Sequence, residues 1–150
     1  MHIRRATRDD GPAVVELIRS LARFEKLPPP DAAAEERLLR DAFGTTPPRV
    51  ELWVAVDAGD QVDGYAACLE SYSTFLARPS LFLEDLFVHP SARRQGIARR
   101  LLEHLRGEAV ARGCGRFEWL VLSWNEDAKS LYRAIGASVE EDWQLVRVVL

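Results

Sequence analysis

The sequence predicts a single domain of the mixed α/β class over residues 1–150, in which helices and strands share one core. Apolar residues recur at helical spacing in four segments and form strand-like runs in six others. The composition is 47% hydrophobic and 29% charged, which is ordinary for one globular domain with a sizeable core. No repeat, low-complexity segment or linker divides the chain, so we expect one continuous fold.

The first half of the chain is predicted to form a strand, two helices and a hairpin. Side-chain oxygens between Thr7 and Asp10 can cap a helix, and Pro12 is tolerated in its first turn. The prolines at 28–30 must end that helix, because proline lacks an amide donor. A change to strand period follows, with a turn at 57–60. The predicted elements are a strand at 2–6, a helix reaching 24–26, a short helix at 32–42, and strands at 50–56 and 62–72.

The second half is predicted around a central strand at 81–88, whose apolar run is broken only by Glu84 and Asp85. A loop at 73–80 leads into this strand. His89-Pro90 ends it, because proline cannot extend a buried strand. The remaining predictions are a helix whose apolar face begins at Ile97, a strand at 117–122, a helix capped by Asn125 and stopped by Gly136, and a last strand at 143–150.

Charge and composition argue against several classes of function. The formal net charge is −3, whereas dedicated nucleic-acid-binding domains are usually strongly basic. No apolar run approaches the roughly 20 residues that cross a bilayer, and the first residues lack the apolar core of a secretory leader. We therefore expect a cytoplasmic protein that binds neither nucleic acid nor membrane. Cys68 and Cys114 show no metal-ligand spacing and no disulfide framework, so we expect no metal site.

A short basic turn between the central strand and the next helix is the first candidate binding site. Gly96 lacks a side chain and Ala98 is small, so the backbone can approach a bulky anion. The first amide groups of a helix have no partner within it and carry the positive end of the helix dipole. This turn therefore suits a phosphate. The alternative is a basic helix start that is only solvated.

Two motifs resemble the Gcn5-related N-acetyltransferase (GNAT) family. The turn matches its acyl-CoA-binding signature R/Q-x-x-G-x-G/A with Arg93, Gly96 and Ala98, and it is neither a Walker loop nor a dinucleotide fingerprint. The second motif, N-x-x-A-x-x-L-Y-x-x-x-G, is matched by Asn125, Ala128, Leu131, Tyr132 and Gly136. The resemblance implies a GNAT-like acyl-CoA N-acyltransferase fold with six to seven mostly antiparallel strands and four helices.

The resemblance also implies acetyl-CoA as cofactor and gives roles to individual residues. Asn125 would bind the pantetheine arm, and Tyr132 would protonate the leaving sulfur as general acid. The two are seven residues apart, so they lie nearly in line on a helix. The alternative for Tyr132 is an aromatic residue packed in the core. The implied cofactor-binding residues are Leu86, Phe87, Val88, Arg93, Arg94, Gln95, Gly96, Ile97, Ala98, Arg99, Asn125, Lys129 and Tyr132, with the strand amides near Phe87 and Val88 as donors to the oxyanion.

Glu84 and Asp85 are costly on an apolar strand, because an unpaired buried carboxylate is heavily penalised. Adjacent strand side chains point to opposite faces, so only one of the pair can enter a given cleft. The resemblance favours Glu84 as the base that removes a proton from the acceptor amine through water. Asp85 would face the other side or bind backbone. The alternative is that both are structural hydrogen-bond acceptors.

Further segments resemble one branch of the family, the spermidine/spermine and thialysine N-acetyltransferases. These segments are residues 21–26, 83–88, 124–126, 136–138 and 140–143. The branch implies a small primary amine as acceptor, which is a diamine, a polyamine or a lysine analogue, and a homodimer to which the C-terminal strand contributes. The implied acceptor-binding residues are Phe24, Glu25, Glu84, Asp85 and Trp143; the alternative for Glu25 is a solvated carboxylate.

The loop at 73–78 departs from the polyamine enzymes. It is neutral and then basic, ending at Arg78, where those enzymes carry an acid. A polycation binds best to spaced negative charges, so the loop favours a shorter amine over spermidine, and Arg78 can pair with a substrate carboxylate.

Three other functions stay open at this stage. They are acetylation of a protein N-terminus or an antibiotic, non-catalytic acyl-CoA sensing, and nucleic-acid binding by the arginines of the turn. Direct attack of the amine is predicted, because neither cysteine is a convincing nucleophile.

Overall fold

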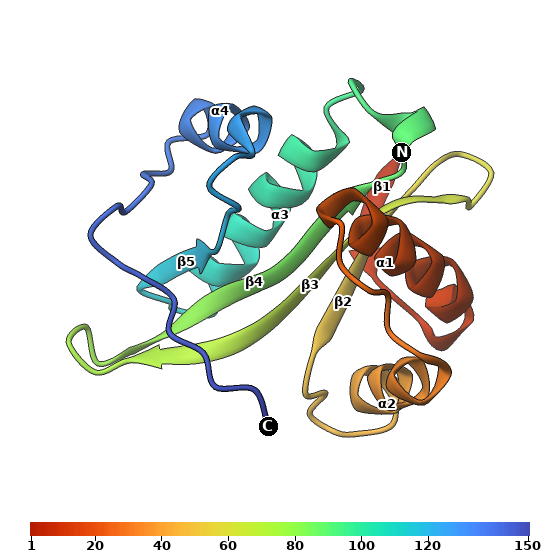
Figure 1. Cartoon of the computed structure of the whole chain (residues 1–150), viewed down its shortest axis with the longest axis horizontal. Coiled ribbons are helices and arrows are strands. Elements are labelled where there is room, and N and C mark those ends of the chain that lie inside the picture. The colour runs from red at the N-terminus through yellow and green to blue at the C-terminus, as the bar shows by residue number, and fades with distance from the viewer. The chain divides into compact units, whose positions relative to one another are not determined.

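The structure is a computed structural model that describes all 150 residues, and Figure 1 labels its helices and strands. Contacts divide the chain into two compact units, Met1–Leu120 and Val121–Leu150. The first unit contains a sheet, three α-helices and two short 3-10 helices. Its elements in order are β1 (His2–Arg5), η1 (Arg8–Asp10), α1 (Gly11–Glu25), α2 (Ala32–Phe43), β2 (Glu51–Val56), β3 (Val62–Ser73), β4 (Arg78–Val88), η2 (Pro90–Ala92), α3 (Ile97–Ala111) and β5 (Arg116–Trp119).

The five strands form one mixed sheet in the order β1-β2-β3-β4-β5. Neighbours from β1 to β4 are antiparallel, and β5 is parallel to β4. The predicted mixed α/β class, the mostly antiparallel pairing and the hairpin of β2 and β3 are therefore confirmed. The predicted count of six to seven strands is too high by at least one.

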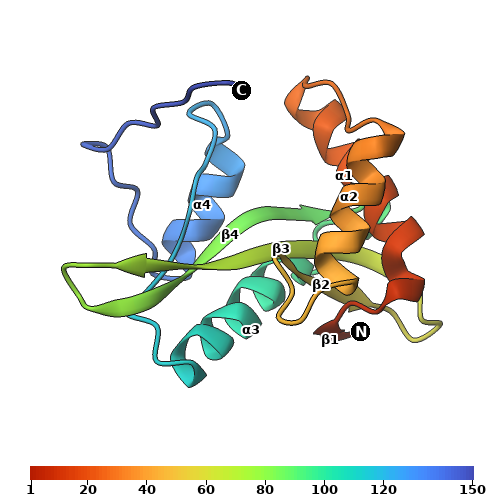
Figure 2. The ribbon, with the colours of Figure 1, turned by 90° about the horizontal axis from the view of Figure 1, so that it is seen from below.

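Helices cover both faces of this sheet. Figure 2 shows α1 and α2 on one side of the sheet and α3 on the opposite side. The core beneath α1 contains Val14 and Leu17 from the helix and Val54, Tyr65 and Phe87 from three strands. This is the apolar helix face that the spacing of the first helix predicted.

The start of α1 is held to β1 by an ion pair. Both guanidinium nitrogens of Arg4 donate to Asp10, at 2.7 and 3.0 Å, and Asp10 also accepts from the Thr7 amide at 2.7 Å. The Arg4 hydrogen bonds, with those from Thr7, lower the pKa of the Asp10 carboxyl to about 2 despite its burial. Asp10 thus stands at the N-cap position of α1, but its side chain makes no capping hydrogen bond to that helix and instead links the helix start to the sheet.

The opposite helix, α3, is anchored at two places. Leu101, Leu102 and Leu105 are fully buried against the sheet, which removes their apolar surface from water. Near its C-terminal end Arg112 donates to both oxygens of Glu51 on β2, at 2.8 and 2.9 Å. These contacts fix the helix whose first residues form the basic turn.

The predicted loop at 73–80 is wrong at its end, because β4 begins at Arg78 and only residues 74–77 connect the strands. Pro79 lies inside β4, opposite Tyr72. The carbonyl of Pro79 accepts from the Gly115 amide at 2.8 Å, on the side away from β3. Proline is tolerated there because a strand residue directs its N–H and C=O to the same side, so no hydrogen bond to β3 is lost.

The second unit contains α4 (Glu126–Ala134), preceded by Asn125 as predicted and followed by Gly136 at a positive φ of 86°. The predicted last strand at 143–150 is wrong, because these residues form neither helix nor strand. Strong β-propensity at Trp143 and Val148 is not enough, since a strand exists only when a neighbour pairs with it; both side chains are largely exposed. The strand predicted at 117–122 also ends early, at Trp119. No helix of the chain has the length and apolar character needed to cross a membrane.

Candidate functional site

The basic turn after β4 has a backbone shaped for an anion. Arg94 and Gly96 both have positive φ, at 64° and 75°, and the first helical hydrogen bond of α3 runs from the Arg100 amide to the Gly96 carbonyl at 3.0 Å. The amides of residues 97–99 therefore have no acceptor within the helix. A Cβ built on Gly96 would meet no atom within 4 Å. The turn thus offers open space in front of unpaired amides, which is the geometry that phosphates occupy.

Arg93 connects this turn to the α1 side of the sheet. Its Nε donates to the Val88 carbonyl at 3.2 Å. Its guanidinium lies over the rings of Phe24 and Phe87, with distances of 5.4 and 5.1 Å to the ring centres. These two rings are themselves 6.5 Å apart. Arg93 therefore packs on the aromatic residues although it is exposed overall, as Arg94 and Gln95 also are.

A β-bulge separates the two acids of the central strand. In the β3–β4 ladder Ala67 lies opposite Asp85 and Cys68 lies opposite Leu83, so Glu84 has no partner on β3. Asp85 shares its face of the sheet with Phe87, because residues two apart on a strand point the same way. That face is the one covered by α1. The predicted simple alternation of Glu84 and Asp85 is therefore interrupted at this point.

Tyr65 on β3 is the residue that sequence reasoning missed. Its side chain is fully buried, and its hydroxyl donates to Asp85 Oδ2 at 3.2 Å. The sequence did place a tyrosine in a predicted strand, and a buried tyrosine hydroxyl usually has a hydrogen-bond partner. The identity of that partner could not be predicted from the sequence, because it depends on which residues face each other across β3 and β4.

The electrostatics around Asp85 are negative. The pKa of the Asp85 carboxyl is raised to about 6, first by burial and then by the charges of Glu84 and Glu25, while the Tyr65 hydrogen bond acts to lower it. The pKa of Tyr65 is raised well above its ordinary value by burial and then by the charge of Asp85. Glu25, Glu84 and Asp85 form no ion pair. The structure therefore gathers the predicted acceptor-binding acids into a region that favours a cation.

The second unit contains the predicted site residues Asn125, Lys129, Tyr132 and Trp143. The side chain of Asn125 accepts from the Ala128 amide at 3.1 Å and so caps α4. Lys129 donates to the Ser123 carbonyl and pairs with Glu126 at 2.8 Å. Tyr132 lies on the same helix, seven residues after Asn125. Trp143 is 82% exposed, and its predicted role in binding the acceptor stays a prediction.

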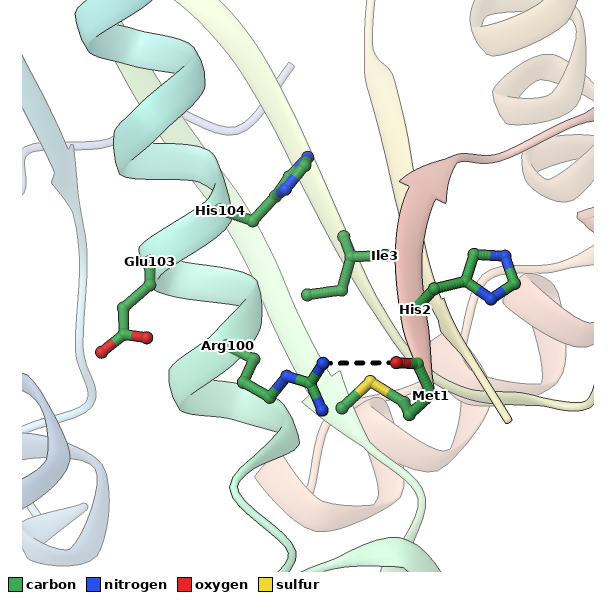
Figure 3. Close-up of a pocket in the computed structure, with 6 residues that line it drawn as sticks. All are labelled: Met1, His2, Ile3, Arg100, Glu103 and His104. Carbon is green, nitrogen blue, oxygen red and sulfur yellow. Dashed lines mark hydrogen bonds between the residues drawn. The ribbon is translucent and has the colours of Figure 1, made fainter. Parts of the chain in front are cut away.

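A separate hollow lies on the α3 side of the sheet (Figure 3). Arg100 donates to the Met1 carbonyl across it at 3.2 Å. Next to it Trp53 Nε1 and His104 Nε2 are buried without a hydrogen-bond partner, and the two rings meet edge-on at 4.8 Å. The hollow contains none of the predicted site residues, and we assign it no part in the chemistry. It is lined by Met1, His2, Ile3, Arg100, Glu103 and His104.

Comparison with known proteins shows similarity over nearly the whole chain. Residues 13–137 match the acetyltransferase (GNAT) family. The chain is 36% identical to a thialysine Nε-acetyltransferase of Bos taurus, over 97% of this chain and 90% of that protein. It is 37% identical to an L-ornithine N5-acetyltransferase of Arabidopsis thaliana, over 58% of this chain and 38% of that protein.

The fold is also found among solved structures. The crystal structure of a probable acetyltransferase superimposes with a TM-score of 0.86 at 20% identity, covering 100% of this chain and 98% of that one. At this identity the likeness concerns the fold alone. It supports the prediction of an acetyltransferase fold independently of the motifs.

The raised pKa of Asp85 predicts a cost to stability that depends on pH. The unfolded chain loses this proton near pH 4 and the folded chain near pH 6, so stability falls as the pH rises through this window. We expect Asp85→Asn to raise the free energy of unfolding by about 1–3 kcal/mol at pH 7.5 and to change it little at pH 3.5. Urea unfolding at the two pH values measures this.

The control for this measurement is Glu118→Gln on β5, which removes an exposed carboxylate. It should change the stability by less than about 0.5 kcal/mol at either pH. A lower stability of Asp85→Asn at pH 7.5 than at pH 3.5, relative to the unchanged chain, would contradict the assignment.

Proposed function

Since this chain belongs to the acetyltransferase (GNAT) family and is an N-acetyltransferase, we propose that its acceptor is the side-chain amine of a small, lysine-like amino acid. The observation that carries the proposal is a group of three carboxylates that form no ion pair, Glu25, Glu84 and Asp85, close to the end of β4 where the phosphate-binding turn is proposed. A cationic amine supplies the charge that this region lacks.

The turn at 93–98 fits the acyl donor, acetyl-CoA, which supplies a thioester whose carbonyl carbon the amine attacks. The amides at the start of α3 would hold the diphosphate, with Gly96 leaving room for it. The predicted contribution of Leu86, Phe87 and Val88 is to offer strand amides to the donor and to the oxyanion.

Two similarities support the proposed acceptor class. Proteins similar to this chain are named for thialysine and for L-ornithine, and both compounds are amino acids with a primary amine at the end of the side chain. The connection at 74–77, ending at the basic Arg78, adds no acid for a longer polycation. We therefore favour a lysine-like amino acid over spermidine or a simple diamine, with Arg78 as a candidate partner of the substrate carboxylate.

The burial and the raised pKa of both cysteine thiols support direct attack by the amine. Cys68 is fully buried, and burial raises the pKa of its thiol to about 12. Burial also raises the pKa of Cys114. A thiolate is the nucleophilic form of cysteine, so neither residue suits an acetyl-cysteine intermediate. Tyr132 remains the predicted general acid and Asn125 the predicted pantetheine ligand, on the family motif.

The proposal also covers the domain organisation, the oligomeric state and the cellular compartment. We propose that both units belong to one acetyltransferase domain, because the family match at 13–137 runs across the boundary after Leu120. A homodimer remains the prediction of the family branch. The cytoplasm remains the predicted compartment, which two free cysteines suit because thiols persist in a reducing environment.

Release of coenzyme A thiol over a panel of acceptors tests the proposed function. We expect the highest kcat/KM with thialysine, lysine or ornithine, and at least tenfold lower values with spermidine, putrescine, a peptide with a free N-terminus and an aminoglycoside. Tight acetyl-CoA binding without turnover of any amine would instead indicate an acyl-CoA sensor. Preference for the peptide or the aminoglycoside would replace the proposed acceptor.

Two matched glycine variants test whether the turn binds the cofactor. Gly96→Ala places a Cβ at a positive φ, which costs about 1 kcal/mol, and projects it into the space proposed for the diphosphate. We expect its Kd for acetyl-CoA to rise about tenfold by titration calorimetry. Gly107→Ala, on the exposed side of α3 where an added Cβ also meets no atom, should leave the Kd unchanged. Equal affinities of the two variants would remove the turn from the binding site.

The role predicted for Tyr132 is tested by removal of its hydroxyl. Tyr132→Phe takes away the proton donor while keeping the ring, so kcat should fall at least 100-fold with little change in the KM for acetyl-CoA. Steady-state kinetics with the best acceptor of the panel measure both constants. Unchanged turnover would show that Tyr132 is not the general acid.

A further inference from the structure

We propose that Asp85, rather than Glu84, takes the proton from the attacking amine, and that Tyr65 is the positioning residue that holds this carboxylate. The inference refines the proposed function and rests on it. It concerns which of two adjacent acids acts and what sets its basicity.

The bulge gives the two acids different surroundings. Glu84 is the extra residue of β4, has no partner on β3 and is exposed. Asp85 is partly buried on the face that also carries Tyr65 and Phe87. A carboxylate that is free to move in water is poorly placed to receive a proton at a defined point, whereas one fixed by packing is placed for it. The structure therefore favours Asp85 on grounds of position.

Tyr65 provides this fixation from the neighbouring strand. Its hydroxyl donates to Asp85 Oδ2 at 3.2 Å, and this is the only hydrogen bond that the Asp85 side chain makes. The other carboxylate oxygen, Oδ1, is left for a second donor. Since the Tyr65 ring is fully buried, its hydroxyl cannot follow the carboxylate elsewhere. The Asp85 carboxylate thus has one oxygen, Oδ2, held by Tyr65 and one oxygen, Oδ1, that can accept a proton.

The charged groups that face Asp85 come from three elements. Glu25 ends α1, Glu84 precedes Asp85 on β4, and both are acidic; Tyr65 on β3 is the neutral donor. The nearby cation of the turn, Arg93, is occupied by the two phenylalanine rings and the Val88 carbonyl. An uncompensated negative region stabilises the protonated form of a buried carboxylate, so Asp85 becomes a stronger base than an ordinary aspartate.

Every proton transferred in the proposed reaction has a donor and an acceptor. The substrate ammonium first passes one proton to Asp85, which releases it to water. The neutral amine nitrogen then bonds to the thioester carbon, and a second proton of that nitrogen passes to Asp85. The carbon–sulfur bond then breaks, and the leaving thiolate takes a proton from the general acid, for which Tyr132 is the prediction. Asp85 releases its proton to water, and the general acid regains one from water. The products are one amide, one coenzyme A thiol and one proton released to water, with no other reactant required.

The titration of Asp85 agrees with this role. Its pKa of about 6, raised chiefly by burial, leaves the carboxylate ionised at neutral pH while making it a far better proton acceptor than a solvated aspartate. The hydrogen bond from Tyr65 acts in the opposite direction and keeps this pKa from rising further.

The pH dependence of kcat/KM for the best acceptor tests the inference with four variants of the full chain. In the unchanged enzyme we expect an acid limb with a midpoint near pH 6. Tyr65→Phe should move this midpoint up by about one unit, because the ionised carboxylate loses its donor. Glu84→Gln should move the midpoint down, because a repelling charge is removed. Asp85→Asn should lower kcat/KM at least 100-fold and abolish the limb.

Tyr72→Phe is the matched control, since this tyrosine lies on the same strand with 65% exposure and its change should not move the limb. Loss of the limb in Glu84→Gln, or an unmoved midpoint in Tyr65→Phe, would overturn the inference. Failure of the unchanged enzyme to acetylate any amine is a separate result, because it refutes the proposed function itself.

Discussion

The structure depends on how β4 accommodates two adjacent acidic residues, Glu84 and Asp85, within an apolar sheet. A continuous ladder would force either Glu84 or Asp85 into the core without compensation, which is costly. The bulge leaves Glu84 exposed and turns Asp85 towards the Tyr65 hydroxyl at 3.2 Å. One polar contact inside the sheet therefore permits a negative site on a strand that is otherwise needed for the core.

The same strand also positions the donor-binding turn. β4 ends at Val88, whose carbonyl holds Arg93, and Arg93 packs on Phe24 and Phe87. The turn, the end of α1 and the acidic region are thus connected by a few direct contacts within one compact unit. On the far side of the sheet, the buried leucines of α3 and the pairing of Arg112 with Glu51 keep the helix start in place. The proposed reaction needs this rigidity, because small errors of position cost large factors in rate.

The sequence allowed the fold class, the helix limits and the turn to be predicted, because these features depend on local patterns. Asn125 and Gly136, for example, bound α4 through their own backbone chemistry. What could not be predicted depends on pairing between distant strands. Tyr65 gained its importance only from the register that sets it beside Asp85, and the segment that ends at Leu150 had strand propensity but no paired neighbour. Glu84 was favoured as base on the family resemblance, and the bulge that gives the two acids different surroundings was not visible in the sequence.

Asp85 is thus a partly buried, weakly acidic carboxylate held by Tyr65. The most direct measurement is a pH titration of the ¹³C carboxyl resonance of Asp85 in the free protein, assigned with Asp85→Asn. A midpoint near pH 6 that rises in Tyr65→Phe is the predicted result. A midpoint near pH 4, unchanged by Tyr65→Phe, would contradict the claim, because it is the behaviour of a solvated aspartate with no special partner.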